Sequence, residues 1–223
     1  MIWKKGSFIA AIFIPVFIGV FLTQAAHKKV SAPEENPAAE EDLHSYSFQN
    51  SPLPLSLSYP ALLTAAPGEN SITLQHELPY VHIDPCDFKG DAPEQQTLAD
   101  FAATFRLLPG NLKSVIAAKE GAAFVSDNWS NETPALSPGF IDQLAVNDFS
   151  GYKITLGVEN CGSYHYYFTV DRSHVLYIER PIVTELTDSV QSDLTIKTLA
   201  EKGLLTPEKA EEIFQNILQS LKL

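Results

Sequence analysis

Basic residues are scarce in this 223-residue sequence: 15 lysine and arginine residues stand against 27 aspartate and glutamate residues, giving a formal net charge of -12 at pH 7. A protein that follows nucleic-acid phosphates needs a cationic surface to displace counterions, and an acidic chain is repelled by the same polyanion. The composition therefore predicts that nucleic acid is not a partner. Hydrophobic residues make up 45% of the chain and charged residues 19%, which is typical of a globular protein and not of a disordered one.

Motifs that carry known chemistry are also missing. The sequence contains no GxSxG elbow, P-loop, GxGxxG, HExxH or EF-hand loop, so nothing in it assigns a nucleophile, a phosphate cradle or a metal site. The acidic pair Glu211-Glu212 is expected on the solvent face of a helix and gives no support for a glycosidase. We therefore predict no cofactor, no metal and no catalytic residue, and an exported hydrolase with an unrecognised active site stays open as an alternative.

One long hydrophobic run is present, near the N-terminus. Residues 8–22 carry no charge and follow Lys4 and Lys5. A helix over residues 7–26 would span the roughly 30 Å hydrocarbon core of a bilayer, whereas Thr23-Gln24-Ala25 is a passable signal-peptidase site. We predict a signal-anchor helix in residues 1–27 that contacts the lipid bilayer through residues 8–26. The alternative is a cleaved signal peptide and a secreted protein.

The next segment, residues 28–45, is rich in proline, alanine and glutamate. Such a composition cannot bury enough apolar surface to offset the entropy of ordering the chain. It predicts a linker that holds a folded domain, residues 46–223, away from the membrane on the extracytoplasmic side, at the cell surface or in the periplasm.

The sequence has two cysteines, Cys86 and Cys161, and both belong to the exported part. Outside the cytosol, the expected fate of such a pair is a disulfide bond. The competing interpretation is a catalytic thiol at Cys161 with His165 as its base. An activated thiol is favoured by a helix N-terminus or a cationic pocket, whereas Gly162 and a strand-like alternating run follow Cys161. We therefore predict the disulfide.

Hydrophobic periodicity predicts mostly strands, with helices near the middle and at the end of the chain. Alternation predicts strands at 53–59, 72–74, 80–83, 152–158, 164–170 and 174–183, with further strands at 113–118 and 122–126. The spacing of Leu98, Phe101, Ala102 and Phe105 predicts an amphipathic helix. Two more helices are expected at 188–202 and 206–221, the last with Thr206 as its N-cap. This order predicts an α+β fold: a central antiparallel β-sheet with helices packed on it, preceded by the N-terminal hydrophobic helix.

Five segments together resemble the PsbP-like fold family: FQNSPLPLSLSYP at 48–60, LADF at 98–101, GYKITLG at 151–157, YHYYFTVD at 164–171 and EEIFQNILQSLKL at 211–223. The resemblance covers residues 45–223. The family includes a photosystem II extrinsic protein and many bacterial secreted or membrane-tethered domains. It implies a central antiparallel sheet covered by helices and a binding role without catalysis. Nothing in these segments implies a role in photosynthesis.

Two clusters could form sites. Aromatic side chains gather on the predicted hairpin, and we take four of them as a candidate binding surface for a protein or envelope partner: Tyr164, Tyr166, Tyr167 and Tyr177. The alternative is that they form core. The segment with His82, Asp84, Cys86 and Asp87 could present metal ligands on an extended chain, but a strand end and a turn at Pro85 explain it as well.

The sequence thus favours a membrane-tethered extracytoplasmic binding domain, with a hydrolase second and a metal or small-ligand carrier third. Two N-glycosylation patterns, at Asn128 and Asn131, matter only in a host that glycosylates.

Overall fold

The computed structural model describes residues 42–49, 54–130, 133–187 and 193–223. All of these belong to one compact unit, Glu40–Leu223. The predicted N-terminal helix and nearly all of the predicted linker lie outside the described residues. Among the helices of the described part, none is long and apolar enough to cross a membrane.

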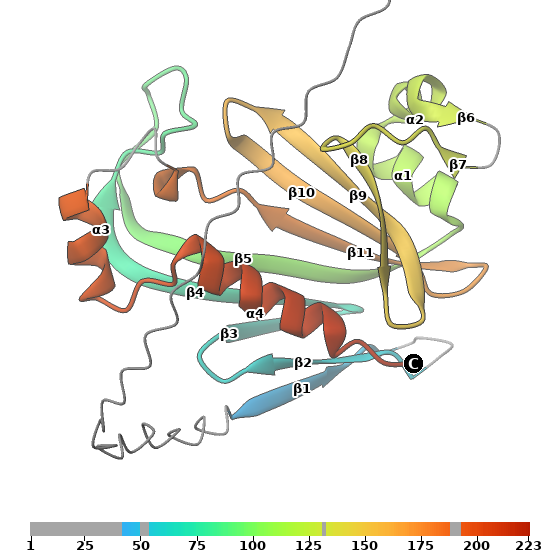
Figure 1. The fold of residues 1–223 in the computed structure, drawn as a ribbon, viewed down its shortest axis with the longest axis horizontal. Helices are drawn as coiled ribbons and strands as arrows, with labels where there is room; N and C mark the ends of the chain where they lie inside the picture. The colour runs from blue at the N-terminus through green and yellow to red at the C-terminus, as the bar shows by residue number, and fades with distance from the viewer. Residues whose placement is uncertain (1–41, 50–53, 131–132, 188–192) are drawn as a thin grey trace, which may run out of the picture. The chain divides into compact units, whose positions relative to one another are not determined.

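A seven-stranded antiparallel sheet forms the centre of this unit (Figure 1). From one edge to the other, its strands are β3 (Thr64–Gly68), β4 (Ser71–His82), β5 (Gln95–Pro109), β11 (His174–Pro181), β10 (Cys161–Thr169), β9 (Phe149–Val158) and β8 (Ile141–Val146). Two short pairs stand apart from this sheet: β1 (Leu43–Ser47) with β2 (Ser56–Pro60), and β6 (Trp129–Ser130) with β7 (Thr133–Pro134). The predicted α+β fold with a central antiparallel sheet is confirmed.

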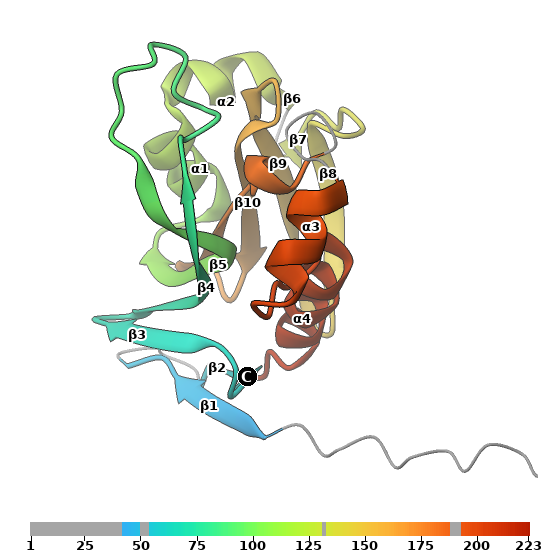
Figure 2. The same ribbon diagram turned by 90° about the vertical axis from the view of Figure 1, so that its left-hand side faces the viewer.

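Helices cover the sheet on both faces (Figure 2). On one face, α4 (Pro207–Gln219) packs with β2 over β5, β10 and β11, and the largest core cluster includes Leu57, Phe105, Phe168 and Phe214. On the other face, α1 (Leu112–Glu120) and α2 (Ala122–Asn128) pack over β8 to β11 through a second cluster. The short helices η1 (Thr184–Leu186) and α3 (Asp193–Ala200) lie near the ends of β4 and β5. Each face of the hairpin β10–β11 therefore contributes to core.

The last helix forms for the reasons that the sequence indicates. The Thr206 side chain accepts a hydrogen bond from the Lys209 N–H at 3.3 Å, and Pro207 occupies the first turn, where its missing N–H costs nothing. Five side chains of one stripe are buried: Ala210, Ile213, Phe214, Ile217 and Leu218. The prediction of this helix is confirmed.

Beyond α4, the chain returns to the N-terminal strands. The backbones of Ser56 and Lys222 exchange two hydrogen bonds of 3.0 Å. The Ser220 hydroxyl accepts from the Ser58 N–H at 2.8 Å and lies 3.0 Å from the Ser58 carbonyl oxygen, to which it can donate. The two ends of the described unit are therefore joined directly.

The helix predicted over residues 98–105 is wrong, because this segment is part of β5, a strand of 15 residues. Phe101 and Phe105 are four positions apart, and residues four apart share a face in a strand as well as in a helix. Ala103 and Leu107 are also buried, which completes the period of two. A bulge opposite His76 and Glu77 shifts the register and brings Leu98 inward as well.

The strands predicted at 113–118 and 122–126 are also wrong, because these segments are the helices α1 and α2. Asn111 caps α1, its side chain accepting from the Ser114 N–H at 3.0 Å. Gly121, at φ 96°, separates the two helices. Pro109 ends β5, not a helix, and Gly110 connects this strand to Asn111, the N-cap of α1.

Candidate functional site

Three of the four tyrosines predicted as a binding surface are buried. Tyr166 packs against Phe214 of α4, with ring centroids 5.0 Å apart, whereas Tyr167 packs against Tyr177 on the opposite face at 5.2 Å. Tyr164 is half-buried. Because helices cover both faces of the sheet, the side chains on either face of β10 lie in a hydrophobic core. The predicted aromatic surface is therefore corrected: these side chains hold the two layers of helices on the sheet.

A polar cluster lies where α1 ends over β10. His165 Nδ1 lies 2.6 Å from Glu120 Oε1, and His165 Nε2 lies 2.8 Å from Ser163 Oγ. The Tyr167 hydroxyl also donates to Glu120. Ser163 and His165 are two positions apart on one strand, so they share a face, and the C-terminal residue of α1 supplies the carboxylate. The order hydroxyl, imidazole, carboxylate is that of a serine-hydrolase triad.

Sequence reasoning missed this cluster, because Glu120 is 45 positions away from His165. It also paired His165 with the wrong residue. Cys161 forms a disulfide bond, so it cannot act as a nucleophile for His165 as base, and that interpretation is wrong.

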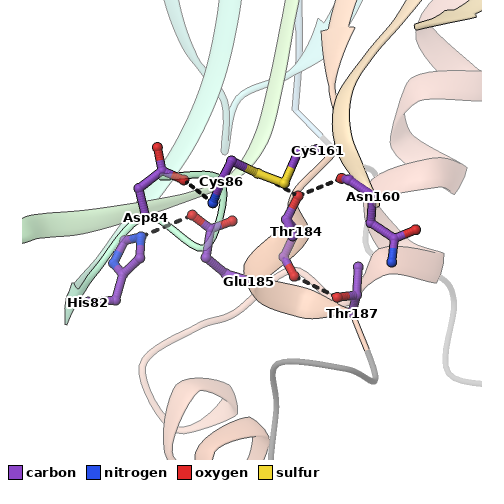
Figure 3. The surroundings of a disulfide bond; sticks show 8 residues. All are labelled: His82, Asp84, Cys86, Asn160, Cys161, Thr184, Glu185 and Thr187. Carbon is purple, nitrogen blue, oxygen red and sulfur yellow. Dashed lines mark hydrogen bonds and ion pairs between the residues drawn. A yellow bond between two sulfur atoms is a disulfide. The ribbon is translucent and has the colours of Figure 1, made fainter. Parts of the chain in front are cut away.

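The Cys86–Cys161 disulfide is present, as predicted, with the two Cα atoms 5.5 Å apart (Figure 3). It joins the loop between β4 and β5 to the first residue of β10. Thr184 of η1 lies beside it, its hydroxyl donating to the Asn160 carbonyl at 2.6 Å. Nearby, the backbones of β9 and β10 approach closely: a Cβ on Gly162 would lie 1.9 Å from the Leu156 carbonyl oxygen. Glycine is therefore required next to Cys161.

The side chains considered as metal ligands have other partners. The His82 ring is turned toward Glu185 of η1, with its Nε2 3.0 Å from Glu185 Oε1 (Figure 3). Asp84 accepts from the Cys86 N–H at 2.8 Å, and Asp87 accepts from the N–H groups of Lys89 and Ala92. Within the described residues, no group of three or more histidine, cysteine or acidic side chains could hold a metal ion. The aspartates instead order the loop, as such side chains do in turns.

Four large apolar side chains are exposed on the two segments that the disulfide joins, and we call them the apolar tip: Val81, Ile83, Phe88 and Val158, at 58%, 63%, 65% and 66% exposure. The first three belong to the end of β4 and the loop that follows. Val158 lies opposite Cys161 in the β9–β10 pairing. The disulfide thus brings two exposed apolar segments together. The sequence did not predict this surface. Alternating apolar residues in a strand are normally taken to face the core, and nothing in the pattern marks these positions as exposed.

Burial also sets the acidity of the core tyrosines. Loss of hydration raises the pKa of Tyr166 to about 12, since the charged phenolate is poorly solvated there. It raises the pKa of Tyr167 and Tyr177 as well, and Glu120 and Glu179 add to both shifts by repelling a second negative charge. All three phenols are therefore neutral at physiological pH.

Asn128, the acceptor of the first N-glycosylation pattern, already uses its side-chain amide in a hydrogen bond. The Asn128 side-chain amide donates to the Phe124 carbonyl at 3.0 Å at the end of α2. Asn131 lies outside the described residues.

No protein-family model matches the chain, and no curated protein matches it. A crystal structure of a protein from Bacteroides thetaiotaomicron VPI-5482, solved at 1.50 Å, is similar to it at 9% identity with a TM-score of 0.36. The match covers 75% of this chain and 44% of that one. Similarity of this degree establishes neither a shared fold nor a shared function, and the resemblance to the PsbP-like family stays a prediction.

Proposed function

We propose that the chain is a membrane-tethered extracytoplasmic binding domain that contacts a protein partner through the apolar tip. The observation that carries this proposal is the exposure of Val81, Ile83, Phe88 and Val158 on two segments held together by a disulfide. Grouped apolar side chains of this size mark interaction surfaces more often than isolated ones. Three of the four tyrosines that the sequence favoured for this role are buried, so we place the surface at the end of the hairpin.

The charged residues near the tip indicate which charge the partner should carry. Five acidic residues lie on the same two segments, against the single basic residue Lys89: Asp84, Asp87, Asp91, Glu94 and Glu159. An anionic bilayer would be repelled by them. A protein with an apolar cleft and a basic rim complements both features, the cleft supplying affinity and the rim speeding the encounter.

The loop is ordered before any partner arrives. The disulfide fixes it at Cys86, and the hydrogen bonds to Asp84 and Asp87 fix its turns. A loop held in this way loses little conformational entropy on binding, which raises the affinity that a small apolar surface can reach. The same disulfide supports an oxidising, extracytoplasmic location.

Site-specific photo-crosslinking in the native host tests this proposal. A benzophenone side chain is placed at Phe88 or Val158, and at Leu136 as the matched control, an exposed apolar residue away from the tip. We expect one discrete protein adduct at both tip positions and none at Leu136. The captured protein is then purified and its affinity for variants of the full chain is measured.

Binding of that purified protein should follow the tip chemistry. Phe88→Ser should weaken it about tenfold or more, as for a buried hot-spot side chain, and Leu136→Ser should leave it unchanged. Asp91→Lys with Glu94→Lys should slow association and flatten its salt dependence. Equal adducts at all three positions, or full affinity of Phe88→Ser, would refute the proposal.

A second candidate function is hydrolysis of a neutral ester, and the Ser163, His165 and Glu120 geometry favours it. Ser163 Oγ would attack the ester carbonyl while its proton passes to His165 Nε2 and then to the leaving alkoxide. Water would hydrolyse the acyl-serine by the same route, and Glu120 would stabilise the imidazolium. This function ranks second because the best-formed cavities over the described residues are not lined by Ser163 or His165.

Labelling with a fluorophosphonate decides the second candidate. If the function is present, mass spectrometry finds the label on Ser163 of the full chain, and Ser163→Ala abolishes it. Ser173→Ala is the control, because Ser173 Oγ also lies near an imidazole nitrogen, 3.1 Å from His174 Nδ1. Equal labelling of wild type and Ser163→Ala would eliminate the hydrolase.

A further inference from the structure

A cavity of about 230 Å³ opens on the face of the sheet that carries α4. Its walls come from β5, β10, β11, the segment after β11 and the first turns of α4. Most of the lining is apolar, including Phe101, Ile182, Val183, Leu186 and Ala210. The polar residues of its lining are Asp100, Tyr164, Arg180, Thr187 and Glu211. Apolar walls with a few convergent polar groups are typical of small-molecule sites.

Arg180 is the cationic group of this cavity, and it is largely withdrawn from water, at 12% side-chain exposure. Its guanidinium lies over the ring of Phe214, 4.6 Å from the centroid. Its Nη1 donates to Glu211. A guanidinium carries five N–H donors, and these contacts in the described structure engage only part of them.

The two carboxylates of the cavity differ in how they are held. Asp100 is buried, with Oδ1 lying 2.6 Å from His76 Nδ1 and Oδ2 accepting from the Leu205 N–H at 2.7 Å. Both of its oxygens are therefore engaged away from Arg180. Glu211 sits on the outer side of α4 with its side chain 50% exposed, and it also accepts from Gln215. Glu211 can thus turn into solvent without breaking the core.

We propose that this cavity binds a small monocarboxylate with an apolar body, and that Glu211 occupies the place of the ligand carboxylate when the site is empty. The ligand carboxylate pairs with Arg180, a geometry that the planar guanidinium favours with two parallel hydrogen bonds. The apolar body lies against Phe101 and Ala210. Glu211 then competes with the ligand for the same donor. This site is separate from the apolar tip and does not depend on the proposed protein partner.

Equilibrium dialysis of radiolabelled benzoate against the full chain in detergent micelles tests the site, with empty micelles subtracted. Benzylamine and benzamide serve as the cationic and neutral probes of equal size. We expect benzoate to bind, and benzylamine and benzamide to bind at least about tenfold more weakly, because they cannot form the charge-assisted pair. Benzylamine binding as tightly as benzoate would overturn the proposal.

Two substitutions at the ion pair should act in opposite directions. Arg180→Gln should weaken benzoate binding about tenfold or more, and Glu211→Gln should strengthen it, because the competing carboxylate is gone. Arg106→Gln, at an exposed arginine of β5, is the control and should change nothing. If the ion pair has only a structural role, Glu211→Gln leaves benzoate binding unchanged or weakens it, and either result refutes the competition.

Ala210→Leu keeps the proposal testable if Arg180→Gln fails to fold. The larger side chain fills the cavity beside the first turn of α4 while both charges stay in place. Benzoate binding should be lost with Arg180 intact. Undiminished binding by this variant would place benzoate elsewhere and contradict the assignment.

Discussion

Replacing both cysteines, Cys86→Ser with Cys161→Ser, is expected to lower the free energy of unfolding by about 4 kcal/mol. The bond closes a loop of 75 positions, and the chain-entropy treatment gives about 4.5 kcal/mol for a loop of this length, an upper figure. Urea denaturation of a protein that begins at Glu40, followed by circular dichroism, measures the change. The midpoint should fall and the slope should rise, because the unfolded chain without the cross-link is less compact and exposes more surface.

The reduced wild-type protein is the matched control. A reductant should bring the wild-type midpoint down to that of the double variant and leave the variant unaffected. The loop should respond first: we expect trypsin to cleave after Lys89 faster in the variant, since the loop loses its attachment to β10. Equal midpoints for oxidised wild type and double variant would mean that this bond does not stabilise the unit.

Alkaline unfolding should begin above pH 10 and be steep, because three buried tyrosines resist ionisation. In the unfolded chain a tyrosine ionises near pH 10, whereas burial raises the pKa of Tyr166 to about 12 and also raises that of Tyr167 and Tyr177. Above pH 10 the folded state therefore binds more protons than the unfolded state. Stability then falls with pH, by about 1.4 kcal/mol per pH unit for each tyrosine concerned.

Absorbance at 295 nm and circular dichroism, recorded together from pH 8 to pH 13, test this expectation. The buried tyrosines should ionise in the same cooperative step that abolishes the folded signal. Tyr166→Phe should make the loss of stability with pH shallower, because one of the three raised pKa values is removed. Full phenolate absorbance in a protein that is still folded would contradict the burial of these groups.

The sequence correctly predicts those features whose local residue pattern is compatible with only one kind of structure. Thr206 and Pro207 predict the start of α4, and alternation in residues 164–170 predicts β10, because neither pattern fits another element. When a chain has only two cysteines and both are predicted to lie outside the cytosol, each has the other as its single expected disulfide partner. These predictions are confirmed by the structure.

The wrong predictions come from residue patterns that fit a helix and a strand equally well. Phe101 and Phe105 fit a strand as well as a helix, and only the neighbours β4 and β11 select the strand. Short apolar segments such as 113–118 fit a buried strand as well as a helix, and Asn111 as N-cap was the signal that would have separated them. The sites required contacts over still longer separations. Glu120 meets His165, and Arg180 meets Glu211, through packing that no local spacing encodes.

The hydrogen bonds between β2 and the end of the chain also set an order of folding. The largest core cluster contains Leu57 from the N-terminal strands and Ile217 from α4, some 160 positions later. Closing so long a loop is entropically costly and slow. The first strands of the domain must therefore wait, without their partner, until the last helix has been synthesised.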